Sequence, residues 1–197
     1  MNNGEKGENE IRKSIIINFN KQFKMENTPK ENIQNLIAQD AIDKLKELIK
    51  KESMCFFCTQ LTQQPITSRP MSTQEVDDMG NIWFLSSIKS DKNTEIEQNS
   101  AVQLFYSNPS SYEFVSLFGT ATILTDREKI HEMWTPFAKA WFKDGKDDAD
   151  ISLIKVSPQS AYYWDTKNNK TISMLQMLAS IVTGSTPDNG VEGTLTI

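Results

Sequence analysis

The chain has 197 residues, a formal net charge of −5 and a sequence pI near 5.0. Hydrophobic residues make up 38% and charged residues 24%, which is typical of a globular domain with its own core. Because nucleic acids and anionic membrane surfaces bind positively charged surfaces, this acidic composition argues against both as partners.

Residues 1–34 are rich in Asn, Lys and Glu and show no sustained apolar period. We therefore predict a flexible N-terminal arm, followed by one domain over residues 35–197. The first ten residues, MNNGEKGENE, are unlike the basic start of a signal peptide. The sequence contains no run of about 18 uncharged apolar residues, which is the length needed to span a membrane, so we expect a cytoplasmic protein.

The first predicted element is a helix over residues 39–51, with Asp40 as its N-cap. Its apolar residues recur every three or four positions and form one buried stripe: Ala41, Ile42, Leu45, Leu48 and Ile49. Five short segments rich in aromatic and β-branched residues follow and are predicted as strands: MCFFCTQL, ITSRPMS, NIWFLSS, AVQLFYS and EFVSLFGTATIL.

Turn residues separate these strands. Asp77, Asp78 and Gly80 predict a hairpin between the second and third segments, and residues 108–111 predict a turn between the fourth and fifth. Gly119, inside the fifth segment, indicates a bulge or a close approach of another backbone.

Cys55 and Cys58 lie in the first strand segment, in the run CFFC. This spacing occurs in redox and zinc sites, but no second CxxC follows and His131 is the only histidine. The competing interpretation is a buried strand whose cysteines are structural, which fits a reducing compartment. We favour the strand and predict no metal site.

A second helix is predicted from Arg127 to Phe142, with Asp126 as its N-cap and a kink or break at Pro136. After the acidic loop DGKDDAD comes a sixth strand, ISLIKVSPQSAYYWD, and then a helix over residues 172–182 that ends at Gly184. The order predicts a mainly β fold with flanking helices (α+β). We expect an antiparallel split β-barrel of about six strands that closes on itself, because closure removes sheet edges.

The segment from Ser86 to Lys92 carries hydroxyl and ammonium groups where a strand gives way to a short helix, KNTEIEQNSAV. The amides of a helix start, together with a lysine and a serine, form a local anion site. The alternative is a polar turn with solvated lysines. Arg69 lies within the second strand segment and therefore needs a charged partner or a place at the barrel mouth.

Several motifs occur in an order that resembles the pyridoxamine-phosphate-oxidase-like family of FMN-binding split barrels, in particular its general stress protein branch. They span residues 36–197 and comprise SRPMSTQEVDDMGNIWFLSS, the turn Ser90-Asp91-Lys92 with EIEQNSAVQLFY, FGTA, DGKDDAD, YWD and ASIVTGSTPDNGVEGTLTI. The resemblance implies an FMN cofactor bound between the two subunits of a homodimer.

It also implies a role for individual residues. The isoalloxazine and ribityl chain are expected to border Arg69, Pro70, Met71 and Ser72, with Leu85, Ser86 and Ser87 on the neighbouring strand. Ser90 and Lys92 are expected to hold the phosphate. Trp164 is expected near the flavin edge, contributed by the second subunit. Trp164 and Trp83 could equally be core aromatics. Asp91 stands where the family often has arginine, and Phe114 where pyridoxamine phosphate oxidases have glutamine.

Two functions follow from the resemblance. One is a flavin-dependent oxidoreductase whose substrate and catalytic residues the sequence does not indicate. The other is a stress protein that binds or senses flavin without turnover. The pyridoxamine phosphate oxidase reaction itself is disfavoured, because no arginine follows Arg127 and no histidine follows His131 to handle the substrate.

Overall fold

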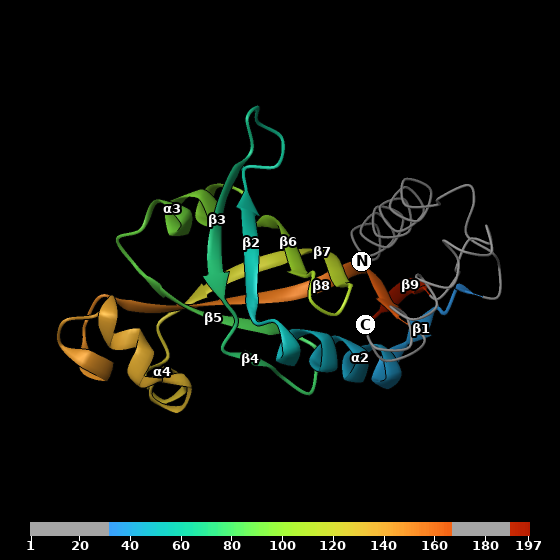
Figure 1. The fold of residues 1–197 in the computed structure, drawn as a ribbon. Helices are drawn as coiled ribbons and strands as arrows, with labels where there is room; N and C mark the ends of the chain where they lie inside the picture. Colours follow the sequence, from blue (N-terminus) through green and yellow to red (C-terminus); the bar gives the residue numbers. More distant parts are fainter. Residues whose placement is uncertain (1–31, 167–189) are drawn as a thin grey trace, which may run out of the picture.

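The computed structural model describes residues 32–166 and 190–197, and its backbone is organised around one long strand, β8 (Ile151–Thr166) (Figure 1). β8 pairs along one edge with β7 (Glu113–Leu124). Its other edge pairs with β5 (Ile82–Ser87) near its start and with β9 (Gly190–Thr196) near its end. The sheet therefore divides on that edge of β8.

The remaining strands extend the sheet beyond β7. The order is β1-β9-β8-β7-β6-β2-β3, with β4 (Glu75–Val76) paired to β5. The additional strands are β1 (Leu36–Ile37), β2 (Met54–Thr59), β3 (Thr67–Ser72) and β6 (Ala101–Asn108). All pairings are antiparallel except that of β1 with β9.

The antiparallel α+β fold and its six main strands are confirmed, whereas the expected closure is wrong. Among the described strands β3 pairs only with β2, and β5 only with β4 and β8, so no ladder joins β3 to β5. The chain instead passes from β3 to β4 through Thr73 and Gln74, whose amides donate to the Ser53 and Trp83 carbonyls. β1, β4 and β9 lie outside the six strands that were predicted.

In the described part of the chain, three α-helices flank this sheet: α2 (Ala38–Lys51), α3 (Asp91–Gln98) and α4 (Arg127–Met133). The predicted stripe of α2 is buried as expected, but Asp40 is not its N-cap. The chain enters α2 directly from β1, so Ile37 is the N-cap and Asp40 lies in the first turn. None of the helices in the described ranges is long and apolar enough to cross a membrane.

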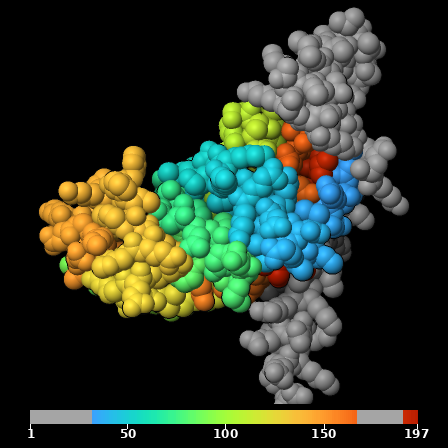
Figure 2. Space-filling model, turned by 90° about the horizontal axis from the view of Figure 1, so that it is seen from below, coloured from blue at the N-terminus to red at the C-terminus, as the bar shows by residue number. Residues whose placement is uncertain are grey.

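The second predicted helix is split at Pro136, as expected. Asp126 caps α4 by accepting a hydrogen bond from the Lys129 amide, and the 3-10 helices η2 (Pro136–Ala140) and η3 (Gly145–Asp147) follow. This segment forms a lobe at one end of the molecule (Figure 2). The predicted helix over residues 172–182 lies outside the described residues, as do residues 1–31 of the N-terminal arm.

Two apolar clusters pack the interior of residues 32–166 and 190–197. The larger one packs α2 against the inner face of the sheet, with Leu45, Phe57, Phe84, Leu117 and Ile154 among its members. The smaller one packs α4 and the η2 region against the start of β8. The larger cluster packs on one face of β5 through Ile82 and Phe84, and the smaller cluster on the other face through Trp83 and Leu85. β5 then leads into the turn where the anion site was predicted.

Two sequence signals in the strands are also confirmed. The ladder between β7 and β8 shifts register at Gly119, where an added Cβ would lie 2.6 Å from the Ser157 carbonyl oxygen. Gly80 has a φ of +78° in the hairpin between β4 and β5, and its amide donates to the Asp77 carbonyl. Glycine is required at both positions, for close approach and for positive φ respectively.

Candidate functional site

The turn from β5 into α3 brings together four predicted residues: Ser86, Ser87, Ser90 and Lys92. β5 ends at Ser87, Ser90 is the N-cap of α3, and Lys92 lies in its first turn. The amide of Asn93 donates to the Ser90 carbonyl at 2.9 Å and so begins the helix. The amides of Asp91 and Lys92, the first two residues of α3, have no carbonyl partner within the helix, and they give this end a partial positive charge.

A buried polar network fixes this turn to the sheet. Ser86 Oγ donates to Asn93 Oδ1 at 2.8 Å, and Asn93 Nδ2 donates to Ser152 Oγ of β8 at 2.8 Å. Ser86, Asn93 and Ser152 are all buried. The Ser90 hydroxyl donates to the Ser87 carbonyl at 2.7 Å. The network therefore sets the position of the first turn of α3, and Lys92 with it.

Arg69 points from β3 toward α3. Its Nη2 donates to Glu95 Oε2 at 2.6 Å, and its Nη1 donates to Thr59 Oγ1 of β2 at 2.7 Å. Thr59 in turn donates to the same Glu95 oxygen. Burial alone would raise the pKa of Glu95, but the hydrogen bonds from Thr59 and Arg69 and the charge of Arg69 together lower it. Arg69 thus has the charged partner that its place in a strand required, and its guanidinium is fixed.

Lys92 differs from the other cations around it. It is half-buried, yet within the described part of the chain it makes no hydrogen bond or ion pair. Burial lowers the pKa of Lys92, and the charge of Arg69 lowers it further, whereas Asp91 and Glu95 raise it. A half-buried ammonium group without a close acceptor, beside a helix start and a fixed guanidinium, fits a phosphate group.

The other predicted residues of β3 and β5 point in different directions. Pro70 and Ser72 face solvent, while the Met71 side chain is packed in the larger core cluster. On β5, Leu85 packs against the smaller cluster around α4, on the opposite face of the strand from Ser86. Met71 can therefore border a ligand through its backbone, and Leu85 lies apart from the network around Asn93.

Trp164 is not brought to this turn. It lies twelve residues beyond Ser152 on β8, which is roughly 40 Å of strand at about 3.3 Å per residue. Its ring packs 4.9 Å from that of Tyr162, and its register partner on β7 is Phe114. Within one chain, Trp164 and Lys92 belong to opposite ends of the sheet.

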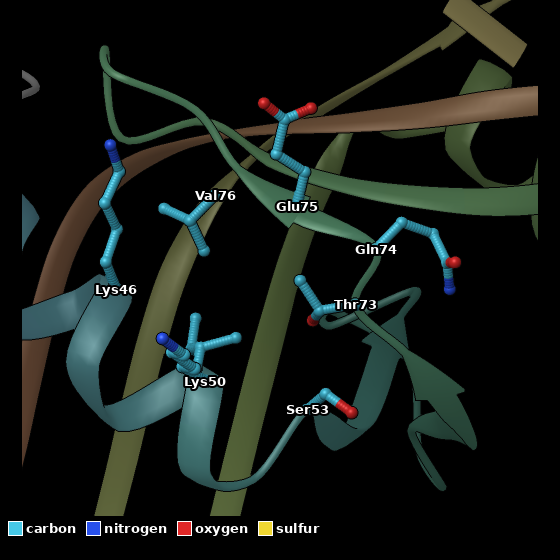
Figure 3. A pocket seen from close by; sticks show the side chains of 8 residues that line it. Lys46, Lys50, Ser53, Thr73, Gln74, Glu75 and Val76 are labelled. Carbon is cyan, nitrogen blue, oxygen red and sulfur yellow. The ribbon is translucent and has the colours of Figure 1, made fainter. Parts of the chain in front are cut away.

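A hollow of about 270 Å³ lies elsewhere, between α2 and β4 (Figure 3). It is lined by Lys46, Ile49, Lys50, Ser53, Thr73, Gln74, Glu75 and Val76, and includes none of the predicted site residues. Lys46 is already paired with Asp78, and the Thr73 hydroxyl with that of Tyr106 at 2.7 Å.

Three carboxylates, those of Glu47, Glu113 and Asp165, also converge where α2 meets β7 and β8. Lys44 bridges Glu47 and Asp165, and Lys51 bridges Glu47 and Glu113. The two ammonium groups supply the positive charge that these carboxylates need, so the cluster is an ion-pair network between helix and sheet.

Sequence reasoning missed Thr59, Asn93, Glu95 and Ser152. Two local signals could have found part of this set, because Asn93 is three residues after Ser90 and Glu95 three residues after Lys92, and such pairs are neighbours on a helix. Thr59 and Ser152 come from strands that only the tertiary fold brings to α3.

The sequence and the fold of the chain both match known proteins. The sequence model of the family described as "Pyridoxamine 5'-phosphate oxidase like" matches residues 40–188. Protein bli-3 of Neurospora crassa is 24% identical over 128 residues, which are 60% of this chain and 61% of that protein. The chain thus spans about three fifths of the length of this curated relative.

Solved structures share the fold. A putative general stress protein 26 from Jannaschia sp. CCS1 has a TM-score of 0.68 and 25% identity, covering 81% of this chain and 99% of that one. General stress protein 26 from Bacillus anthracis has a TM-score of 0.55 and 22% identity, covering 62% and 92%. The general stress FMN/FAD-binding protein of Xanthomonas citri has a TM-score of 0.55 and 24% identity, covering 65% and 88%.

Proposed function

Because the chain belongs to the pyridoxamine 5'-phosphate oxidase-like family, we propose that it binds FMN, with the flavin phosphate at the start of α3. The observation that carries this proposal is the half-buried ammonium group of Lys92, which has no close acceptor in the described residues and lies near the fixed guanidinium of Arg69. The name of the Xanthomonas citri relative, an FMN/FAD-binding protein with this fold, supports the same ligand.

In this proposal the phosphate accepts hydrogen bonds from the first amides of α3, from Lys92 and from the Ser90 hydroxyl after rotation about its χ1 bond. Arg69 belongs with the phosphate rather than with the flavin ring, since Glu95 of α3 holds its guanidinium. The ring then extends along β3, whose second edge is unpaired among the described strands and presents backbone donors and acceptors.

We further propose a homodimer with the flavin between its subunits. Phe56 of β2 and Phe105 of β6 are register partners on the outer face of the sheet and are 57% and 40% exposed, and Phe56 also faces Pro70 of β3. An apolar surface beside the predicted flavin strand is suited to a second subunit. Trp164 can meet the flavin only from that subunit, because it lies at the far end of β8 from Lys92.

The proposed activity is that of a flavin-dependent oxidoreductase with an unidentified substrate. Bound FMN would supply transfer of a hydride or of single electrons. The residues of this chain would hold the phosphate, orient the ring along β3 and exclude water from one of its faces.

The second candidate is a cytoplasmic protein that binds or senses flavin without turnover. The pairing of His131 with Asp147 in the α4 lobe, at 3.0 Å, favours it. His131 is the single histidine of the chain, and within the described residues it forms no hydrogen bond or ion pair with the residues of the proposed phosphate site.

Flavin binding is tested by adding FMN to the purified chain and recording its visible spectrum and flavin fluorescence. We expect saturable binding. Lys92→Met should weaken FMN binding roughly 10- to 150-fold, because a charge-assisted hydrogen bond contributes about 1.5–3 kcal/mol. Lys89→Met is the matched control: it removes the same charge three residues away, from a lysine that is paired with Asp150 and exposed.

Equal affinities of the two variants would refute the phosphate assignment, and absence of binding by the unmodified chain would refute the proposal as a whole. If FMN binds, the two candidate functions separate on turnover. Oxidation of NADH or NADPH with an added electron acceptor supports the oxidoreductase, and saturable binding without turnover supports the flavin-binding protein.

A further inference from the structure

We propose that Glu95 keeps the phosphate end of the flavin site electrically balanced, so that flavin is held as an exchangeable ligand rather than a permanently bound group. This inference rests on the proposed FMN site. It assigns a role to a residue that neither the motif nor the family resemblance singled out, and it concerns how strongly the site distinguishes FMN from riboflavin, which lacks the phosphate.

The contacts of Glu95 give it two effects. Its Oε2 accepts hydrogen bonds from Arg69 of β3 and Thr59 of β2, so it fixes the guanidinium against α3. Only 13% of its side-chain surface is exposed, and the negative charge of its carboxylate acts on Lys92, three residues earlier on α3. Glu95 is therefore a positioning residue that also places a negative charge beside the proposed phosphate.

The charges around Lys92 cancel. Arg69 and Lys92 are the cations and Asp91 and Glu95 the carboxylates that act at this ammonium group. A phosphate monoester carries a charge between −1.5 and −2 at neutral pH. It would meet hydrogen-bond donors here, but the charged side chains contribute no net positive charge, so their long-range attraction would add little to the local contacts.

Glu95→Gln separates the two effects of the carboxylate. Glutamine keeps the length of the side chain and an oxygen that can accept from Arg69 and Thr59, while it removes the negative charge. The site then has a net charge of +1 and should bind the phosphate more tightly. Riboflavin should bind equally well to both forms, because it carries no charge for Glu95 to repel.

The experiment measures dissociation constants for FMN and for riboflavin with the full chain, and the rate of FMN release. We expect the ratio of the riboflavin constant to the FMN constant to rise about tenfold in Glu95→Gln, with slower FMN release. Glu97→Gln is the matched control, since Glu97 is an exposed glutamate on the same helix. Asp91→Asn should raise the ratio as well, and it tests the charge balance if Glu95→Gln fails to fold.

An unchanged or lower ratio in both Glu95→Gln and Asp91→Asn would overturn the inference while leaving FMN binding intact. A rise of equal size in Glu97→Gln would also overturn it, because the effect would then be one of overall charge. Failure of every form to bind either flavin would instead overturn the proposed function on which the inference rests.

Discussion

Replacement of Asn93 by alanine tests whether the buried network holds the start of α3. Asn93 is 2% exposed and makes two hydrogen bonds of 2.8 Å, one with Ser86 and one with Ser152. Each such bond contributes about 1 kcal/mol, and a buried hydroxyl left without a partner costs roughly 1–3 kcal/mol. Ser86 keeps a longer contact with Ser90 at 3.2 Å. We therefore expect the free energy of unfolding to fall by about 2–3 kcal/mol.

For a chain of this length, 1 kcal/mol corresponds to roughly 2–4 °C in Tm, so the expected loss is about 4–12 °C. Urea denaturation followed by circular dichroism measures the free energy directly. Thr94→Ala is the control, because Thr94 is exposed on the same turn and such surface changes stay within about 0.5 kcal/mol. Asn93→Ala should also weaken FMN binding through displacement of Lys92. A loss of stability no greater than that of Thr94→Ala would refute the role given to the network.

Three further outcomes are expected. Burial raises the pKa of Cys55 to about 12 and also raises that of Cys58, so neither thiol should react with a thiol reagent at pH 8 until the chain unfolds; labelling of the native protein would contradict this burial. Gly119→Ala should destabilise the fold by about 1–3 kcal/mol, measured by urea denaturation, because its Cβ would lie 2.6 Å from the Ser157 carbonyl oxygen; an unchanged midpoint would show that the bulge can adjust. The pKa of Lys92 is lowered below 10.5, so the unfolded chain binds more protons between the two pKa values. Stability without flavin should then rise with pH across that window in the unmodified protein relative to Lys92→Met, and parallel pH profiles of the two would contradict the shift.

Much of the sheet could be predicted because the alternation of buried and exposed residues in a strand is visible in consecutive residues of the sequence. β7 spans Glu113–Leu124, the bounds that its sequence segment predicted. β9 was missed for a local reason, since it contains two glycines, which strands disfavour. The structure supplies the reason for one of them: a Cβ on Gly193 would lie 2.0 Å from the Gln34 carbonyl oxygen, so only glycine allows the incoming chain to pass β9.

The residues of the candidate site likewise fall into those that the local sequence predicts and those that depend on tertiary contacts. Ser90 and Lys92 could be identified from sequence because a strand end, a cap and a helix start are adjacent in the chain. The partner of Arg69 could not, since Glu95 lies 26 residues away on another element and three elements must pack before the contact exists. The missing closure has the same origin: pairing between β3 and β5 depends on how the intervening residues cross, which no strand pattern specifies.

The arrangement around Arg69 also bears on which proposed function suits the chain. A half-buried guanidinium needs a compensating charge whether or not ligand is present, because an unpaired charge in such a position is strongly destabilising. Glu95 supplies that charge from within the chain, so the site does not depend on phosphate to be folded. Two cations without Glu95 would repel each other and would make ligand a requirement for stability. A chain that is stable with and without flavin is suited to taking up and releasing it, and we therefore expect thermal unfolding of the flavin-free protein to remain cooperative. Loss of that cooperative transition on removal of flavin would show that the ligand, rather than Glu95, completes the fold.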